Sequence, residues 1–174
     1  MKKEIFSWIK SILLAVALVV ICREFIFMPV TVDGESMLPT FEEENKVVVS
    51  KLTSIDRFDM VVFDAPDDEV LYIKRVIGLP GDTIEVKDEV LYVNGKAYKE
   101  EYVNREYDGE IVTGDFTLEE MTGSTEVPKG HYFVMGDNRL RSKDSRTFGF
   151  ISDETVEGEV KFRFFPFNEI GMPE

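Results

Sequence analysis

Cysteine and histidine are almost absent from this chain of 174 residues, which has one of each. A single Cys cannot form an intramolecular disulfide framework or a CxxC metal site. His131, the only histidine, cannot build a zinc site of the HExxH type. We therefore expect no metal and no cofactor. A catalytic triad would have to use His131, which lies in a strand-like run where a structural role is expected.

Positive charge is also scarce, with 20 Lys and Arg against 34 Asp and Glu and a net charge of −14. The imbalance is uneven, because residues 1–30 carry a net charge of +2 and the rest of the chain carries −16. A domain that acidic repels the phosphates of nucleic acids, so we expect no nucleic-acid partner. The composition suits a domain that stays soluble beside an anionic surface.

Residues 5–22 are apolar except for two serines and one lysine. As a helix these 18 residues would span about 27 Å, roughly the hydrocarbon core of a bilayer. Lys2 and Lys3 precede the run, so the positive-inside rule places the N-terminus in the cytoplasm. We expect residues 1–28 to be a single-pass anchor in the cell membrane and residues 29–174 to be an extracytoplasmic domain.

Two alternative interpretations of this segment stay open. A removable signal peptide requires a small-x-small cleavage site after the apolar run, but the run is followed by Cys22-Arg23-Glu24-Phe25. A lipidated Cys22 requires a small residue before it, and the residue there is Ile21. An uncleaved anchor fits the sequence better than either alternative.

Short runs rich in β-branched and aromatic residues follow the anchor and indicate strands. These runs are residues 46–50, 60–63, 70–77, 83–86, 90–93, 131–135 and 159–165. Asn94-Gly95, directly after one of them, is typical of a hairpin turn. Residues 115–121 are expected to form at most one helical turn. The predicted fold class is mostly β: an N-terminal transmembrane helix followed by an antiparallel β domain.

Residues 102–126 are polar and contain three glycines. Such a stretch predicts a long connection or part of an inserted subdomain. We place a small inserted β subdomain at about residues 83–130. By itself this architecture leaves the function open, because an extracytoplasmic β domain can be a binding module or an enzyme.

Ser36 lies in an irregular segment, Gly34-Glu-Ser-Met-Leu-Pro-Thr40. Pro39 shortly after the serine disfavours a helix there. A serine held in this way can direct its own N–H at a substrate carbonyl, as a nucleophile requires. The pattern alone is also typical of a structural or solvated loop serine, and it is not the GxSxG motif of a nucleophile elbow.

Lys74 lies within an apolar strand, where alternation places it on one face with Val70, Tyr72 and Val76. Charge is costly among apolar neighbours, so the pKa of Lys74 should fall. A neutral lysine is a usable general base. The alternative is an amphipathic strand whose lysine reaches the solvent at its edge.

Residues 136–146 pack four cationic side chains, two carboxylates and two serines into eleven positions of an acidic protein. This segment is either a polar loop closed by local ion pairs or a scaffold that fixes other residues through buried hydrogen bonds.

Together the three segments resemble type I signal peptidases of the serine–lysine kind, in their compact Gram-positive form. The matching blocks are GESMLPT at 34–40, YIKRVIGLPGD at 72–82, GDNRLRSKDSR at 136–146 and a shorter block at 59–63. The resemblance implies a membrane-bound serine endopeptidase that removes N-terminal signal peptides from exported preproteins. Its partners would be those preproteins and membrane lipid, with the export translocon close by.

The resemblance also implies roles for single residues. Ser36 would be the nucleophile, Lys74 its base and Ser142 the residue that orients the lysine amine. Further positions would be Asp144 and Arg146 as supporting charges, and Val32, Met37, Phe41 and Tyr72 as the lining of shallow substrate pockets. The Ser36 backbone N–H would donate to the oxyanion. Gly34 stands where Gram-negative members have a serine, so a hydroxyl donor to the oxyanion is missing and a backbone N–H or water would replace it.

Two rival functions remain at this point. One is a related serine–lysine peptidase that cleaves itself or one dedicated partner. The other is a non-enzymatic, membrane-tethered β module that binds ligands at the cell surface.

Overall fold

The structure is a computed structural model that describes residues 2–105 and 111–172. Residues 106–110, which belong to the predicted connection 102–126, lie outside the described residues, as do residues 1, 173 and 174.

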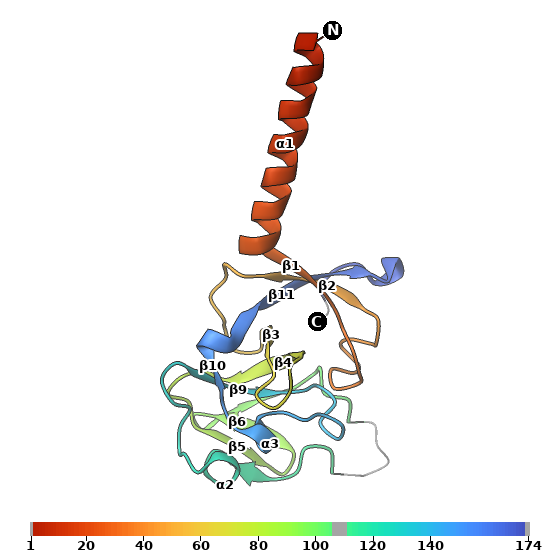
Figure 1. Cartoon of the computed structure of the whole chain (residues 1–174). Helices are drawn as coiled ribbons and strands as arrows, with labels where there is room; N and C mark the ends of the chain where they lie inside the picture. The colour runs from red at the N-terminus through yellow and green to blue at the C-terminus, as the bar shows by residue number, and fades with distance from the viewer. Residues whose placement is uncertain (1, 106–110, 173–174) are drawn as a thin grey trace.

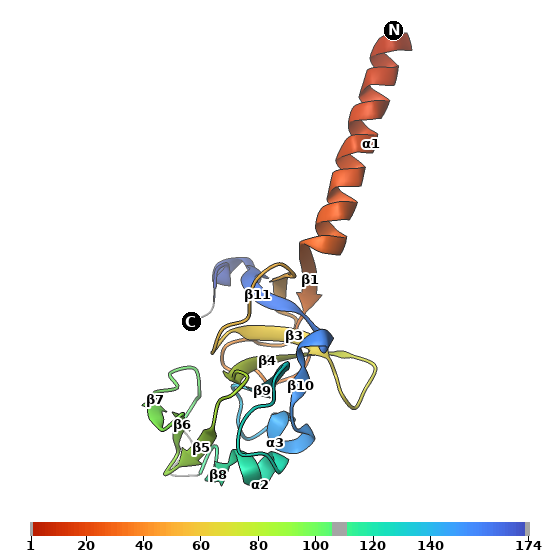
Figure 2. The ribbon, with the colours of Figure 1, turned by 90° about the vertical axis from the view of Figure 1, so that its left-hand side faces the viewer.

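Helix α1 (Lys2–Phe25) extends away from the rest of the protein, as Figures 1 and 2 show from two directions. Large apolar side chains along it are exposed, among them Trp8 at 71% and Val19 at 67%. Within the part of the chain that the structure describes, no helix combines the length and the apolar character needed to cross a membrane.

Seven strands form the larger sheet, and every neighbouring pair in it is antiparallel. In spatial order they are β1 (Phe27–Thr31), β2 (Lys46–Ser50), β11 (Val156–Phe165), β3 (Met60–Asp64), β4 (Leu71–Gly78), β9 (His131–Met135) and β10 (Ile151–Ser152). Strand β11 comes late in the chain yet lies between β2 and β3 (Figure 1). The prediction of a mostly antiparallel β fold is confirmed.

A second sheet of four strands is formed by the chain between β4 and β9 (Figure 2). Its spatial order is β7 (Lys96–Tyr98), β6 (Val90–Val93), β5 (Ile84–Lys87) and β8 (Phe116–Thr117). The predicted hairpin joins β6 to β7, where Asn94 and Gly95 have φ angles of 53° and 73°. Two successive positive φ values suit the twist of a two-residue hairpin.

The remaining helices are short. They are α2 (Leu118–Thr122), α3 (Ser145–Phe148) and the 3₁₀ turns η1 (Asp153–Thr155) and η2 (Phe167–Glu169). Helix α2 is the expected single turn, and it begins with a capping box in which Thr117 and Glu120 bind each other's backbone N–H groups.

Strands β3 and β4 lie in the centre of the larger sheet and are covered on both faces. Val61 and Val76 pack in one cluster of buried side chains, whereas Val62 and Ile73 pack in another. This double burial explains the nearly continuous apolar character of both strands. It also places Lys74, in the middle of β4, in the interior of the protein.

Candidate active site

A cleft of about 280 Å³ opens beside the centre of the larger sheet. It is lined by residues 30–36, Val62, residues 71–74, Arg141 and Lys143. All four blocks that carry the resemblance therefore contribute residues to this cleft, although they lie far apart along the chain.

Ser36 lies in the β1–β2 connection, in a tight stretch of backbone turns. Gly34 has a φ of 79°, a conformation that favours glycine. After it the Leu38 N–H donates to the Glu35 carbonyl at 3.2 Å, and the Phe41 N–H donates to the Met37 carbonyl at 2.9 Å. These turns give the segment the irregular, non-helical form expected from its sequence.

Lys74 is 4% exposed, and its Nζ lies 2.9 Å from Oγ of Ser36. Nζ also donates to the Ile73 carbonyl at 2.9 Å and lies 5.0 Å from the centre of the Tyr72 ring. Burial lowers the pKa of the Lys74 amine to about 8, against an opposing effect of the Asp144 and Asp137 carboxylates. A substantial fraction of the amine is therefore neutral near physiological pH.

The face predicted for Lys74 is partly right. Tyr72 and Val76 do pack in one cluster, together with Val61, the partner of Lys74 across the sheet. Val70, however, precedes β4 and is 48% exposed. The prediction was wrong there because the strand begins one residue later.

Asp144 is fully buried and caps α3 by accepting from the Arg146 N–H at 3.2 Å. The Arg146 guanidinium binds both of its oxygens, at 2.9 and 2.8 Å, and the Gly136 N–H donates to it at 3.0 Å. Burial raises the pKa of the Asp144 carboxyl, but Arg146 and the Gly136 N–H outweigh it and hold this pKa below its usual range. Asp144 is therefore a fixed negative charge behind the cleft.

Ser142 lies close to the Asp144 carboxyl. Its Oγ is buried, and among the described atoms no partner meets the geometry of a hydrogen bond. A Cβ added to Gly136 would collide with Ser142 and would lie 2.5 Å from the Ser36 carbonyl oxygen. Ser142 and the Ser36 carbonyl therefore both lie against Gly136.

The four residues expected to line substrate pockets divide into two groups. Val32 and Tyr72 line the cleft. Met37 and Phe41 have no exposed surface, and they pack in the same cluster as Val32 and the cleft residue Ile73. Met37 and Phe41 therefore support the cleft from the core side and are not part of its lining.

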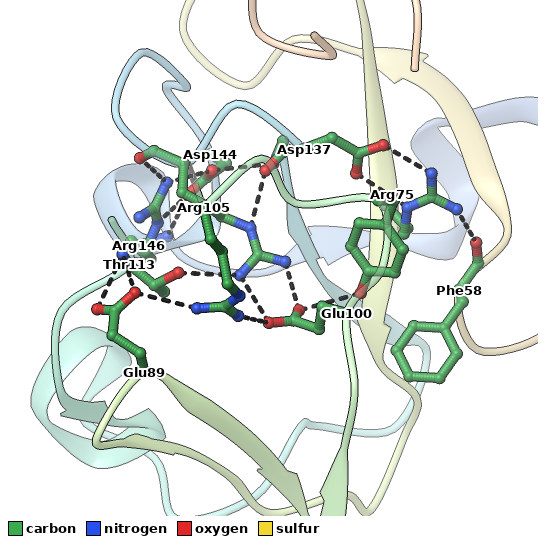
Figure 3. A network of polar contacts seen from close by, with 12 residues as sticks. Phe58, Arg75, Glu89, Glu100, Arg105, Thr113, Asp137, Asp144 and Arg146 are labelled. Carbon is green, nitrogen blue, oxygen red and sulfur yellow. Dashed lines mark hydrogen bonds and ion pairs between the residues drawn. The ribbon is translucent and has the colours of Figure 1, made fainter. Parts of the chain in front are cut away.

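Several residues near the site received no role from sequence reasoning. Asp137 and Asn138 lie in the block 136–146, of which only Ser142, Asp144 and Arg146 were assigned. Arg75 follows Lys74 in β4, and its guanidinium binds the buried Asp137 carboxylate at 2.6 and 2.9 Å (Figure 3). The available signal was an Arg next to a Lys within an apolar strand, since a buried arginine requires an acidic partner.

His131 lies outside the cleft. Its ring nitrogen is 3.1 Å from the Lys129 carbonyl oxygen, and the ring packs edge-on against Phe150 at 6.5 Å. It is not among the cleft-lining residues.

Comparisons with known proteins agree on one family. The family described as "Signal peptidase, peptidase S26" matches residues 5–165. Signal peptidase I of Bacillus caldolyticus is 50% identical over 91% of this chain and 90% of its own length. Signal peptidase IB of Staphylococcus aureus (strain COL) is 43% identical over 97% of this chain and 94% of its own.

A solved structure supports the same relationship. A crystal structure of a signal peptidase I from Enterococcus faecalis V583 matches with a TM-score of 0.59 at 46% identity, covering 62% of this chain and 97% of that one. The self-cleaving peptidase and the binding module are not favoured by these relatives. The chain belongs to the signal peptidase family, peptidase S26.

Proposed function

We propose that this serine endopeptidase uses Ser36 as nucleophile and Lys74 as general base to remove N-terminal signal peptides from exported preproteins. The observation that carries the proposal is the 2.9 Å approach of Lys74 Nζ to Ser36 Oγ at a cleft, by a lysine whose pKa is lowered to about 8. A nucleophile within hydrogen-bond reach of a base of matched pKa is the arrangement that acyl transfer requires.

The reaction begins with the neutral Lys74 amine taking the Ser36 proton as Oγ attacks the carbonyl carbon of the scissile bond. The tetrahedral intermediate collapses as Lys74 gives that proton to the leaving amine, and the signal peptide remains on Ser36 as an ester. Lys74 then takes a proton from water, which attacks the ester, and Ser36 regains its proton. No metal or cofactor takes part in these steps.

The backbone N–H of Ser36 is our candidate donor to the oxyanion. Within the described residues it donates to no protein acceptor, whereas the Ser36 carbonyl accepts from Asn138. A donor already fixed in place stabilises the developing charge without reorganisation. Gly34, which lines the cleft, has no side chain and so offers no hydroxyl as a second donor; a backbone N–H or water takes that place.

Asp144, Arg146 and Ser142 influence the charge and the orientation of the Lys74 amine. Asp144, held by Arg146, is a fixed negative charge that favours the protonated amine during turnover. Ser142 lies close to this carboxylate and also to Gly136, where an added Cβ would collide with Ser142 and with the Ser36 carbonyl oxygen. We assign to Ser142 the orientation of the Lys74 amine once substrate has bound, and to Val32 and Tyr72 the contacts with small substrate side chains.

We further propose that residues 1–28 anchor the enzyme in the cell membrane, with the N-terminus in the cytoplasm and residues 29–174 as the extracytoplasmic catalytic domain. Helix α1 has 24 residues and would be about 36 Å long. Its leucines and valines are largely exposed among the described residues. An anchor beside the domain would place the cleft near membrane lipid and the export translocon, where preproteins emerge. Residues 83–130 form the inserted β subdomain in this proposal.

The test of the cleavage proposal is incubation of the detergent-solubilised full chain with a preprotein, with Ser36→Ala as the matched inactive variant. We expect wild type to release a mature protein whose new N-terminus, read by mass spectrometry, follows the signal peptide. Cleavage by the Ser36→Ala variant at the wild-type rate would refute the proposed nucleophile. For the anchor, protease added to intact protoplasts should digest the domain, and full protection of the domain would refute the proposed topology.

A further inference from the structure

Glu100 follows β7 of the smaller sheet, and its side chain is only 1% exposed. One carboxylate oxygen accepts from Arg139 at 2.5 Å and from the Tyr102 hydroxyl at 3.0 Å. The other accepts from Arg105 at 3.1 Å and from Arg139 at 3.3 Å. Figure 3 shows Glu100 at the centre of this network, with Arg105 and Glu89 on one side. A buried carboxylate needs such partners, and both oxygens of Glu100 have them.

Arg139 connects Glu100 to the chain segment beside the cleft. Its side chain is fully buried, and its Nε donates to the Gly136 carbonyl at 3.0 Å. The Arg139 carbonyl accepts from Arg146 at 2.9 Å. The ion pair with Glu100 therefore fixes the Arg139 side chain. Because that side chain also binds the Gly136 carbonyl, the ion pair fixes the backbone of residues 136–139 as well.

This segment contacts the nucleophile directly. The Asn138 N–H donates to the Ser36 carbonyl at 3.0 Å, and the Asn138 side-chain amide donates to the Glu35 carbonyl at 3.0 Å. On the other side of Asn138, Asp137 is fixed by Arg75, whose guanidinium carbon lies 4.0 Å from the centre of the Tyr102 ring. Asp137 is thus held by an arginine that packs on Tyr102, and Arg139 is held by Glu100. Both neighbours of Asn138 therefore depend on residues 100–102.

We infer that Glu100 is a positioning residue for the catalytic serine: by neutralising Arg139 it holds the backbone of residues 136–138 against Ser36. An arginine cannot lose its proton, so Arg139 without Glu100 is a buried charge that must move toward water. Its movement withdraws the donor from the Gly136 carbonyl and loosens the Asn138 contact. The smaller sheet therefore contributes to catalysis without touching substrate. The inference rests on the proposed role of Ser36.

The first experiment compares Glu100→Gln with Glu101→Gln in the full chain. Glu101 is the adjacent residue, is 77% exposed and pairs with the exposed Lys99, so it is a matched control. We expect Glu100→Gln to lower kcat about 10- to 100-fold with KM within about twofold, because a small misplacement of a reacting group has effects of this size. Glu101→Gln should keep wild-type kcat. Wild-type kcat in folded Glu100→Gln would overturn the inference.

The double variant Glu100→Gln/Arg139→Gln separates positioning from folding. It removes the unpaired buried charge, so its melting temperature should recover relative to Glu100→Gln while kcat stays low. Recovery of wild-type kcat would overturn the inference, because the Glu100–Arg139 ion pair would then not be needed to position Ser36. If neither variant folds, Glu100→Asp decides: a shortened carboxylate should lower kcat in the folded protein, and unchanged kcat would count against positioning.

Amide hydrogen exchange provides a readout that does not depend on activity. Peptides covering residues 136–141 should exchange faster in Glu100→Gln than in wild type or in Glu101→Gln, since the Asn138 N–H loses its fixed acceptor. Equal exchange in all three proteins would refute the link. If wild type itself failed to cleave a preprotein, the proposed function would fall, while this measurement would still test the contact.

Discussion

Asn138 donates its backbone N–H to the carbonyl of Ser36 at 3.0 Å, and this bond fixes the orientation of that carbonyl. The carbonyl is held while the Ser36 N–H has no acceptor among the described residues, so that N–H is available for the oxyanion of the proposed mechanism. The site therefore depends on backbone geometry as much as on the two reacting side chains.

Replacement of either reacting residue should abolish cleavage. We expect Ser36→Ala and Lys74→Ala to lower kcat to below a few per cent of wild type, and the double variant to be no worse than either single one. Members of a catalytic pair act as a unit, so their effects do not add. The measurement is kcat with a preprotein, alongside circular dichroism as a control for folding. Substantial activity in either single variant would exclude this pair.

The pH dependence of cleavage should follow the neutral amine. With a Lys74 pKa of about 8, the active fraction rises about tenfold between pH 7 and pH 9 and falls as the pH drops. The initial rate at low substrate concentration is the quantity to measure. His131→Ala should leave this profile unchanged. A profile centred near pH 6.5 that disappears in His131→Ala would indicate a histidine base instead.

Lys74 should reduce the stability of the enzyme. Its pKa is about 8 when folded and about 10.4 when unfolded, so between these values the unfolded state binds more protons. The free energy of unfolding therefore rises with pH between about pH 8 and about pH 10.4. Below pH 8 the cost of burying the charged amine is fully present and amounts to at most about 3 kcal/mol.

Lys74→Met, which fills the same space without charge, should accordingly be more stable than wild type at pH 7. Its advantage should shrink between pH 8 and pH 10. Urea unfolding at pH 7 and pH 9.5 provides the comparison. An advantage that does not change with pH would mean that burial does not perturb this amine.

Gly136→Ala should inactivate the enzyme. The added Cβ would lie 2.5 Å from the Ser36 carbonyl oxygen and would also overlap Ser142, so the segment must shift. We expect kcat to fall more than about 100-fold. Gly123→Ala is the control, because its φ of 75° makes alanine strained there but no atom lies near its Cβ. That variant should lose about 1 kcal/mol of stability and keep its activity.

Substrates with small residues at positions −1 and −3 should be preferred. The cleft is only about 280 Å³, and Val32 and Tyr72 line it. A peptide series with Ala, Ser, Val or Phe at −1 should show kcat/KM falling with side-chain size. Equal cleavage of the Phe peptide would refute the assignment of these residues to a pocket.

The long apolar strands could be predicted because β-branched runs have a strong local preference for extended structure. Residues 46–50, 90–93 and 131–135 form strands with the predicted bounds. Strand β1 was missed because Pro29 weakens its pattern, and it lies at the edge of the sheet where proline is tolerated. The two-residue strands β8 and β10 are too short to carry a pattern and depend on their partners.

The two residues proposed to react could be found from short sequence blocks, but the residues that hold them in place could not. Ser36 and Lys74 lie in segments with distinctive local sequence. Glu100 has an ordinary local sequence, and it gains its role only because folding brings it to Arg139, 39 positions away. Such a pairing leaves no periodic or local signal. For Arg75 the local sequence does indicate a buried arginine that needs an acidic partner, but it does not identify that partner as Asp137, 62 positions away.

The place of β11 in the larger sheet also determines when the enzyme can first act. The loop with Ser36 joins β1 to β2, Lys74 lies on β4 beside β3, and within the sheet these two pairs meet only through β11. In a growing chain that ends before residue 156, Ser36 and Lys74 belong to two hairpins that the sheet has not yet joined. We therefore expect the proposed activity to begin only after β11 has been synthesised, which would keep an unfinished chain from cleaving other proteins.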